Sequence, residues 1–273
     1  MKKISIILLA LLAVTACQIS FSDPSFDDQA ATQVSLALTQ TVQALEIEQH
    51  VKQTATAAAG SAEDEEESPA DTPVPDFDPA IDLGAPTWSD NLNTGDYWSV
   101  ESGPVKIDTT TISHDNGKLT IEASAVGKGN NWWLTYLKFK DAYLEGVFST
   151  DNCSGDDQYG LVFRAPDYNS GFSYYFHVTC DGRYDLRRWN GSGSSMLLGM
   201  PSSNAINKGA GGENKLGVWI KGNTIRLYIN GIKVDELSDD GLTGEGYFGL
   251  FINAKNTPGF KVHLDEISYW LLN

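Results

Sequence analysis

The residues best suited to chemistry lie in one short stretch, Ser173 to Trp189, which reads SYYFHVTCDGRYDLRRW. Apolar residues alternate there with polar or aromatic ones, as in an antiparallel strand pair with one face on a core and one face outward. The interleaved residues supply an imidazole, a carboxylate, guanidinium groups and an indole, which together offer hydrogen bonds and an apolar surface. The pattern predicts a ligand-binding patch. The alternative is a solvated outer face. Each of its cross-strand charge pairs would stabilise the fold by only about a few tenths of a kcal/mol, the lower end of the range for such pairs.

Matching apolar residues across strands predicts the register of this region. A three-residue turn over residues 180–182, with its glycine left-handed, pairs the apolar residues of one strand with those of the next. The same register places His177 opposite Asp185 on the other face. The preceding strand, residues 158–164, is expected to pair with residues 172–180 through the loop PDYNSG. The predicted patch then consists of Arg164, Tyr175, His177, Asp185, Arg187 and Trp189.

The elements that must position this patch are short strands. From Trp88 onward, alternating runs are separated by turn residues, and Asn230-Gly231 is a strong hairpin signal because both residues tolerate positive φ. Alternation across Trp132-Trp133 buries one indole and leaves the other at or near the surface. Residues 86–273 are therefore predicted to form an all-β jelly-roll sandwich of antiparallel sheets. Expected strands are 118–126, 132–139, 143–150, 158–164, 172–180, 215–221, 224–230, 232–237, 247–253 and 260–270.

Three segments of the chain carry a family resemblance. They read GLVFRAPDYNSGFSYYFHVTCDGRYDLRRW, LGVWIKGNTIRLYINGIKVDEL and GYFGLFINAKNTPGFKVHLDEISYW. Together they resemble the concanavalin A-like lectin/glucanase sandwich, and within it the 3-keto-disaccharide hydrolase domain family. The resemblance implies a sheet that is concave on its outer side with glycans lying across it, so that the patch would bind carbohydrate and Trp189 would meet a sugar ring. The fold also hosts hydrolases and adhesion modules, so the resemblance implies the fold more strongly than the activity.

Catalysis is an open alternative to binding. Laminarinase-type members of the fold use a Glu-x-Asp-x-(x)-Glu strand whose carboxylates act as nucleophile and acid, and no Glu of this sequence has an Asp two residues later. His177 beside Asp185 could form an oriented general base, but no nucleophile motif accompanies it. We expect a binding module, with a hydrolase of the 3-keto-disaccharide type or a structural protein–protein module as alternatives. Calcium is common in the wider fold, and the resemblance places Asp90 and Asp265 at the corresponding positions. A turn-capping role is the alternative for Asp265.

Residues 1–17, MKKISIILLALLAVTAC, have the layout of a secretory signal. Their apolar run is too short for a spanning helix, which needs about 20 apolar residues. Val14-Thr15-Ala16-Cys17 resembles the lipobox of bacterial lipoproteins, which implies lipid attachment at Cys17 and a position on the extracytoplasmic face of the cell membrane. An ordinary cleaved signal is the alternative. In an exported chain the remaining cysteines, Cys153 and Cys180, are expected to form a disulfide.

The segment between the signal and the sandwich has a different composition from both. Residues 18–60 are rich in Ala, Thr and Gln with helical spacing of their apolar residues, which predicts a partly helical stalk. Residues 61–85 combine an acidic cluster with four prolines, which predicts an extended linker. The net charge of the chain is −17 and no basic stripe is present, so nucleic acid is disfavoured as a partner.

Overall fold

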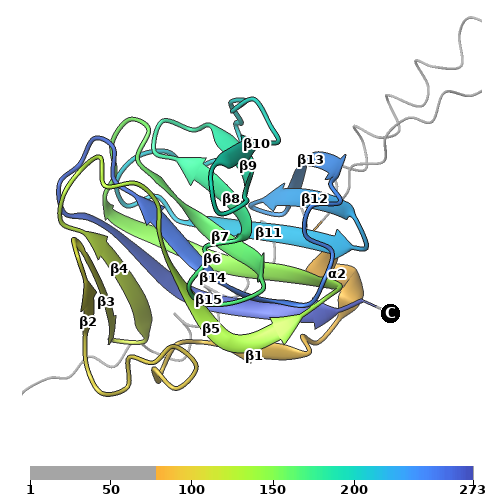
Figure 1. The fold of residues 1–273 in the computed structure, drawn as a ribbon, viewed down its shortest axis with the longest axis horizontal. Coiled ribbons are helices and arrows are strands. Elements are labelled where there is room, and N and C mark those ends of the chain that lie inside the picture. The colour runs from red at the N-terminus through yellow and green to blue at the C-terminus, as the bar shows by residue number, and fades with distance from the viewer. Residues whose placement is uncertain (1–77, 273) are drawn as a thin grey trace, which may run out of the picture. The chain divides into compact units, whose positions relative to one another are not determined.

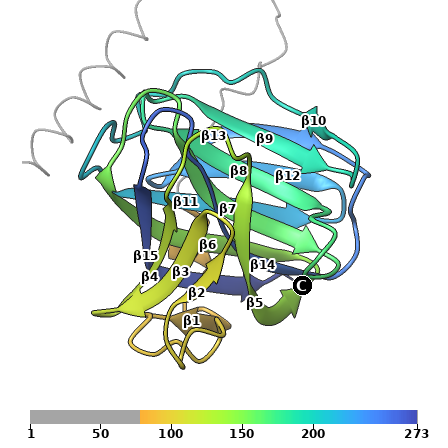
Figure 2. The same cartoon turned by 60° about the vertical axis from the view of Figure 1, so that its left-hand side comes forward.

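The structure is a computed structural model that describes residues 78–272 of the chain. The predicted signal, the predicted lipidation site Cys17, the predicted stalk and most of the predicted linker lie outside these residues. The described part folds into two antiparallel sheets packed face to face (Figures 1 and 2). The predicted all-β jelly-roll sandwich is confirmed. Across residues 78–272, no helix is both long enough and apolar enough to traverse a bilayer.

The larger sheet contains nine strands within the described residues. Eight follow the order β13-β12-β11-β6-β15-β4-β3-β2, and β1 pairs with β15. The two longest, β6 and β15, pair along most of their length at the centre of this sheet. The strands are β1 Trp88–Asp90, β2 Val105–Ile107, β3 Thr110–Asp115, β4 Lys118–Ala123, β6 Ala142–Asn152, β11 Asn214–Lys221, β12 Thr224–Ile229, β13 Ile232–Ser238 and β15 Phe260–Leu271.

The smaller sheet contains residues 173–189, the stretch that supplies most of the predicted patch. Its order is β10-β9-β8-β7-β14-β5, so that β5 forms one edge. Its strands are β5 Asn131–Phe139, β7 Gln158–Ala165, β8 Ser173–Thr179, β9 Tyr184–Trp189, β10 Ser194–Met196 and β14 Gly246–Asn253.

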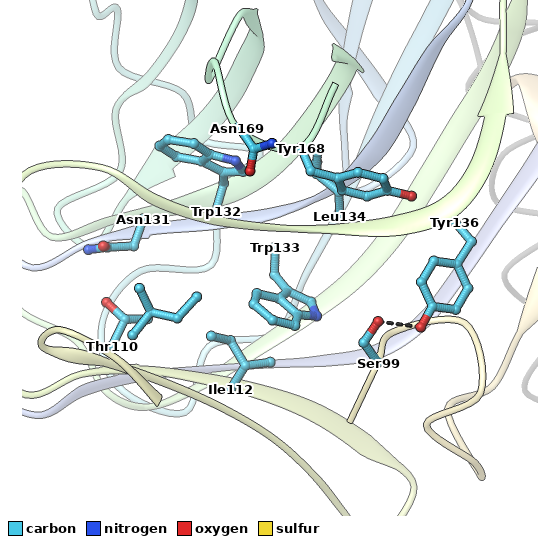
Figure 3. A pocket seen from close by; sticks show the side chains of 11 residues that line it. Ser99, Thr110, Ile112, Asn131, Trp132, Trp133, Leu134, Tyr136, Tyr168 and Asn169 are labelled. Carbon is cyan, nitrogen blue, oxygen red and sulfur yellow. Dashed lines mark hydrogen bonds between the residues drawn. The ribbon is translucent and has the colours of Figure 1, made fainter. Parts of the chain in front are cut away.

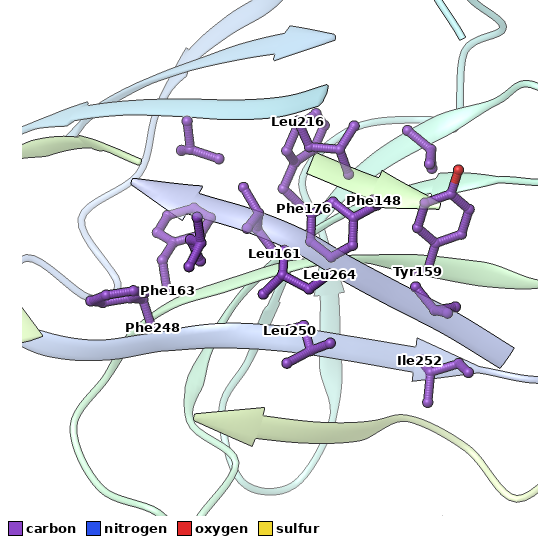
Figure 4. Packing of buried hydrophobic residues seen from close by; sticks show 14 of the residues in the cluster. Phe148, Tyr159, Leu161, Phe163, Phe176, Leu216, Phe248, Leu250, Ile252 and Leu264 are labelled. Atoms are coloured by element: carbon purple, nitrogen blue, oxygen red, sulfur yellow. The ribbon is translucent and has the colours of Figure 1, made fainter. Parts of the chain in front are cut away.

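The core lies between the two sheets and is made by strand alternation. Leu161 and Phe176 are cross-strand partners in the smaller sheet and point inward toward Phe148 and Leu264 of the larger sheet (Figure 4). All four side chains are fully buried. Burial of one such side chain contributes about 1.5–3 kcal/mol relative to exposure. The inward set therefore fixes which residues of β7, β8 and β9 face outward.

The hairpin between β8 and β9 has the predicted register. His177 lies opposite Asp185, and Ser173 lies opposite Trp189. The turn closes through Gly182, whose φ is +92°, a conformation that glycine adopts without steric cost. The predicted disulfide between Cys153 and Cys180 is present beside this turn.

The last residues of the predicted linker are folded against the sandwich instead of being extended. Asp78 precedes the short helix α2, Pro79–Leu83, and accepts a hydrogen bond from the ammonium of Lys215 at 2.5 Å. At the other end of α2, the indole N–H of Trp270 donates to the carbonyl of Gly84 at 2.8 Å. Trp270 belongs to an aromatic cluster on the outer side of the larger sheet. Composition predicted an extended linker because it does not show these individual anchors.

Candidate functional site

The outer face of the smaller sheet carries most of the predicted patch. Tyr175 and Trp189 pack in a separate cluster on the side of the sheet away from the core. Arg187 is the cross-strand partner of Tyr175, so it shares that face. Trp189 and Arg187 are half-buried and Tyr175 is buried. These three residues form, together with Trp132 of β5, what we call the outer patch.

Arg164 does not belong to the outer patch, which corrects the prediction. Its φ of +54° lies in the left-handed region, at a point where the register between β7 and β14 shifts. The irregularity turns the side chain off the outer face. The guanidinium is buried and donates to the carbonyl of Leu242 at 2.8 Å and to the carboxylate of Asp141 at 3.3 Å. Arg164 therefore joins loops at the end of the strand and is unavailable to a ligand on the patch.

Two indoles flank the loop that crosses one end of the outer patch. A Cβ on Gly171 would lie 3.0 Å from the Trp132 ring and 3.4 Å from the Trp189 ring, so this glycine sits between them. The hydroxyl of Tyr175 donates to the Gly171 carbonyl at 3.0 Å and holds the loop down. The ring centroids of Tyr175 and Trp132 are 6.5 Å apart. The patch is thus a set of aromatic side chains positioned around one close-packed backbone segment.

The polar residues at the other end of this face are enclosed. His177 and Asp185 are 1% and 0% exposed, so neither reaches a ligand on the surface, in contrast to the prediction. Neither ring nitrogen of His177 makes a hydrogen bond to a described residue, nor does Asp185 Oδ1 or Gln158 Nε2. Asp185 Oδ2 accepts from Arg187 Nε at 2.5 Å. We call Gln158, His177 and Asp185 the buried polar row.

The environment sets the charge of the buried polar row. Burial, followed by the positive charges of Arg187 and Lys255, lowers the pKa of His177 to about 3, so the imidazole is neutral. Burial raises the pKa of Asp185, and the hydrogen bond and charge of Arg187 act against this shift. The guanidinium of Arg187 is therefore held by a buried carboxylate, which fixes its position on the outer patch.

Asp90 and Asp265, predicted as calcium ligands, have protein partners. The carboxylate of Asp90 accepts from the backbone N–H of Leu92 at 2.8 Å and from the Trp98 indole N–H at 3.0 Å. Asp265 accepts from Ser149 Oγ at 2.7 Å and forms an ion pair with Lys118. Within residues 78–272 no group of three or more His, Cys, Asp or Glu side chains is arranged to hold a metal ion. Both carboxylates satisfy donors of the chain itself, which is the turn-capping alternative, and calcium binding at these residues stays a prediction.

A pocket of about 340 Å³ adjoins the outer patch at the edge strand β5 (Figure 3). It opens where this edge approaches β2 and β3 of the larger sheet, and it uses both sides of β5. Trp132 belongs to the outer patch, whereas Trp133 packs against the core. The Trp132-Trp133 pair was the only sequence signal for this pocket. Its walls are Ser99, Ile107, Thr110, Ile112, Asn131, Trp132, Trp133, Leu134, Tyr136, Tyr168 and Asn169.

Three solved structures illustrate the folds to which this chain is similar. Carbohydrate-binding module CBM66 from Bacillus subtilis is 14% identical, with 68% of this chain and 96% of that chain covered and a TM-score of 0.43. A Bacillus subtilis protein of unknown function with a galectin-like fold is 14% identical, with 68% and 96% covered and a TM-score of 0.48. A Bacteroides ovatus GH16 protein in complex with a glucan product is 9% identical, with 67% and 99% covered and a TM-score of 0.48.

No curated protein matches the sequence at a significant level. A family match does exist and spans residues 86–263, from the segment before β1 into β15. This span exceeds half of the 273-residue chain and includes every strand of the smaller sheet. The resemblance seen in the three sequence segments is thereby confirmed. The chain belongs to the family described as the 3-keto-alpha-glucoside-1,2-lyase-like domain.

Proposed function

We propose that this domain binds carbohydrate on the outer patch. The observation that carries the proposal is the placement of two half-buried indoles, Trp132 and Trp189, on either side of Gly171. An indole face can pack on the apolar C–H side of a sugar ring, and here each ring is already held by packing. Because little side-chain entropy remains to be lost on binding, such pre-organised rings favour affinity.

Arg187 supplies the polar part of the proposed site. Its Nε is bonded to Asp185, and its side chain is 19% exposed, so part of the guanidinium remains accessible to a ligand. A guanidinium carries five N–H donors, which suit the hydroxyl oxygens of a sugar. The cross-strand position beside Tyr175 places these donors next to the aromatic residues. The outer patch thus combines apolar faces with fixed hydrogen-bond donors.

We also propose that the chain is lipid-anchored at Cys17 on the extracytoplasmic face of the cell membrane. The signal-like residues 1–17 and the lipobox-like ending support this proposal, and the Cys153–Cys180 disulfide suits an exported protein. Metabolic labelling with palmitate tests it. We expect label in the full chain and none in Cys17→Ala. Equal labelling of the two chains would contradict the anchor.

A glycan array followed by titration calorimetry with the full chain tests the binding proposal. We expect binding to at least one polysaccharide and at least a tenfold loss of affinity in Trp189→Ala. Trp219→Ala is the matched control because this indole lies on the larger sheet, where it stacks with Arg226. The control should bind as the native chain does. Failure of the native chain to bind any glycan would reject the proposal.

A second candidate function is the chemistry for which the family is named, cleavage of a 3-keto-α-glucoside. Such an elimination needs a base that removes a proton next to the keto group. His177 is enclosed and cannot contact a ligand on the surface, so it does not supply this base. The family match over residues 86–263 is the observation that favours this function. Release of the aglycone from a 3-keto-α-glucoside by the full chain is the expected result, and absence of turnover would reject this function.

A further inference from the structure

We propose that the pocket at β5 binds one uncharged sugar ring, the terminal unit of a glycan whose neighbouring units lie on the outer patch. This inference rests on the proposed carbohydrate binding and adds a substrate class, neutral chain ends. The pocket volume of about 340 Å³ lies near the lower limit of ordinary ligand pockets, about 300–1,000 Å³. A pocket of this size suits one ring and is too small for a long chain.

The chemistry of the walls selects an uncharged ligand. None of the eleven residues that line the pocket carries a charge. Transfer of an ionised group from water into such a site is costly unless an opposite charge pairs with it. Uronic acids, sugar phosphates and amino sugars with free ammonium groups are therefore disfavoured. Neutral sugars incur no such cost.

One polar atom in the pocket wall has no partner. Thr110 is 2% exposed, and its hydroxyl makes no hydrogen bond to any described residue. A buried hydroxyl without a hydrogen bond is energetically unfavourable, so a ligand hydroxyl that bonds to Thr110 would remove this cost. Asn131 and Asn169 line the same pocket and each contributes an amide that both donates and accepts. These groups match the alternating donors and acceptors of a sugar ring.

The aromatic walls are held in place before any ligand arrives. The indole N–H of Trp133 donates to the carbonyl of Trp98 at 2.6 Å, and the hydroxyl of Tyr168 donates to the carbonyl of Thr135 at 3.2 Å. Tyr136 and Ser99, which both line the pocket, are hydrogen-bonded to each other (Figure 3). With these anchors in place, the rings should not collapse into the pocket. Rigid aromatic walls are the feature that the pocket and the outer patch share.

Trp132 connects the two sites. It lines the pocket, and it also lies beside Tyr175 and Gly171 on the outer patch. A glycan with its last ring in the pocket would therefore meet the same indole with its next ring. Linking two weak contacts in one ligand raises the apparent affinity without any further contact. The arrangement predicts a preference for chain ends over internal segments of a polysaccharide.

The test uses the full chain and a panel of neutral monosaccharides, glucose, galactose, mannose, xylose, fructose and N-acetylglucosamine, with glucuronate as the charged probe. Saturation-transfer NMR should show binding of at least one neutral sugar and none of glucuronate. Thr110→Val should lower the affinity for this monosaccharide at least tenfold. Trp189→Ala should change the same affinity less than twofold. Thr110→Val removes only an unbonded hydroxyl, so the fold should be retained.

Thr150→Val is the matched control, because Thr150 also has a buried and unbonded hydroxyl but lies in β6, outside the pocket walls. It should leave sugar binding unchanged. Two results would overturn the pocket inference: no monosaccharide binds, or Thr110→Val has no effect on monosaccharide binding. If a polysaccharide still binds and Trp189→Ala weakens that binding, the proposal of carbohydrate binding on the outer patch stands. If glucuronate or a purely apolar probe binds in place of neutral sugars, the inference is overturned as well.

Discussion

His177 and Asp185 face each other across β8 and β9, yet no hydrogen bond joins the imidazole to the carboxylate. Both side chains are almost fully enclosed. The carboxylate turns instead to Arg187, at 2.5 Å, and the imidazole is left neutral among apolar and positively charged neighbours. A buried group of this kind makes the stability of the fold depend on pH.

We expect the fold to lose stability as the pH falls from about 6.5 toward 3. The pKa of His177 drops from 6.5 to about 3 on folding, so the unfolded chain takes up a proton first and is favoured in that range. The slope contributed by His177 is at most about 1.4 kcal/mol per pH unit. Asp185, whose pKa burial raises, contributes in the opposite direction at low pH, because its folded form takes up a proton more readily than the unfolded chain.

Urea unfolding at a series of pH values isolates the effect of His177. The difference between the native chain and His177→Gln should change with pH below 6.5 and stay constant above it. His263→Gln is the control, since His263 lies on β15 of the other sheet. Parallel pH profiles for native and His177→Gln chains would show that the imidazole is solvated in the folded state.

Gly171→Ala should weaken carbohydrate binding more than it weakens the fold. The added methyl group would lie 3.0 Å from the Trp132 ring and 3.4 Å from the Trp189 ring, and would displace at least one indole. Its φ of +69° also costs about 1–2 kcal/mol for a residue with a side chain. Gly127→Ala is the matched control, with a φ of +70° and nothing within 4 Å. The two variants should lose similar stability, whereas calorimetry should show reduced affinity only for Gly171→Ala.

Loss of the disulfide should destabilise the fold by about 3–4 kcal/mol, the loop-closure value for a separation of 27 residues between Cys153 and Cys180. Denaturant unfolding of the double variant Cys153→Ala, Cys180→Ala measures this. A reductant should destabilise the native chain similarly and leave the double variant unaffected. If reductant changed neither chain, the cysteines would be unbonded in the folded protein.

Chelation with EDTA should shift the melting temperature of the full chain by less than about 1 °C. Both oxygens of Asp90 are used by Leu92 and Trp98, so removal of divalent cations breaks no contact there. Asp90→Ala should instead lower the melting temperature by several degrees, because it leaves the buried Trp98 indole N–H unbonded at a cost of about 1–3 kcal/mol. A large drop with EDTA in calorimetry would indicate a calcium ion.

The register around the patch could be predicted because its inward residues are unambiguous. Phe176 lies opposite Leu186, and only one register of β8 and β9 buries both side chains. This register also determines which residues face outward. The strands β1, β2 and β10 were not predicted because three residues hold too few alternations to show a period. β3 was missed for a related reason, since Ile112 is its only aliphatic residue.

The site was harder to predict than the fold. Alternation predicted Arg164 on the outer face. Its own positive φ turns the side chain away from that face. Arginine rarely adopts this conformation, so the sequence did not predict it. Alternation also predicted His177 on the correct face without showing that this end of the face is covered. The pocket combines Ser99 with Tyr168 and residues between them, so its shape depends on how two sheet edges meet.

The anchoring of α2 determines on which side the chain enters the sandwich. Asp78 and Gly84 are bonded to Lys215 and Trp270, on the outer side of the larger sheet, while Trp189 faces outward from the smaller one. The entry point and the outer patch are therefore back to back. A fusion partner, a dye or a solid support attached ahead of Asp78 would leave Trp189 accessible, which suits surface-based binding measurements.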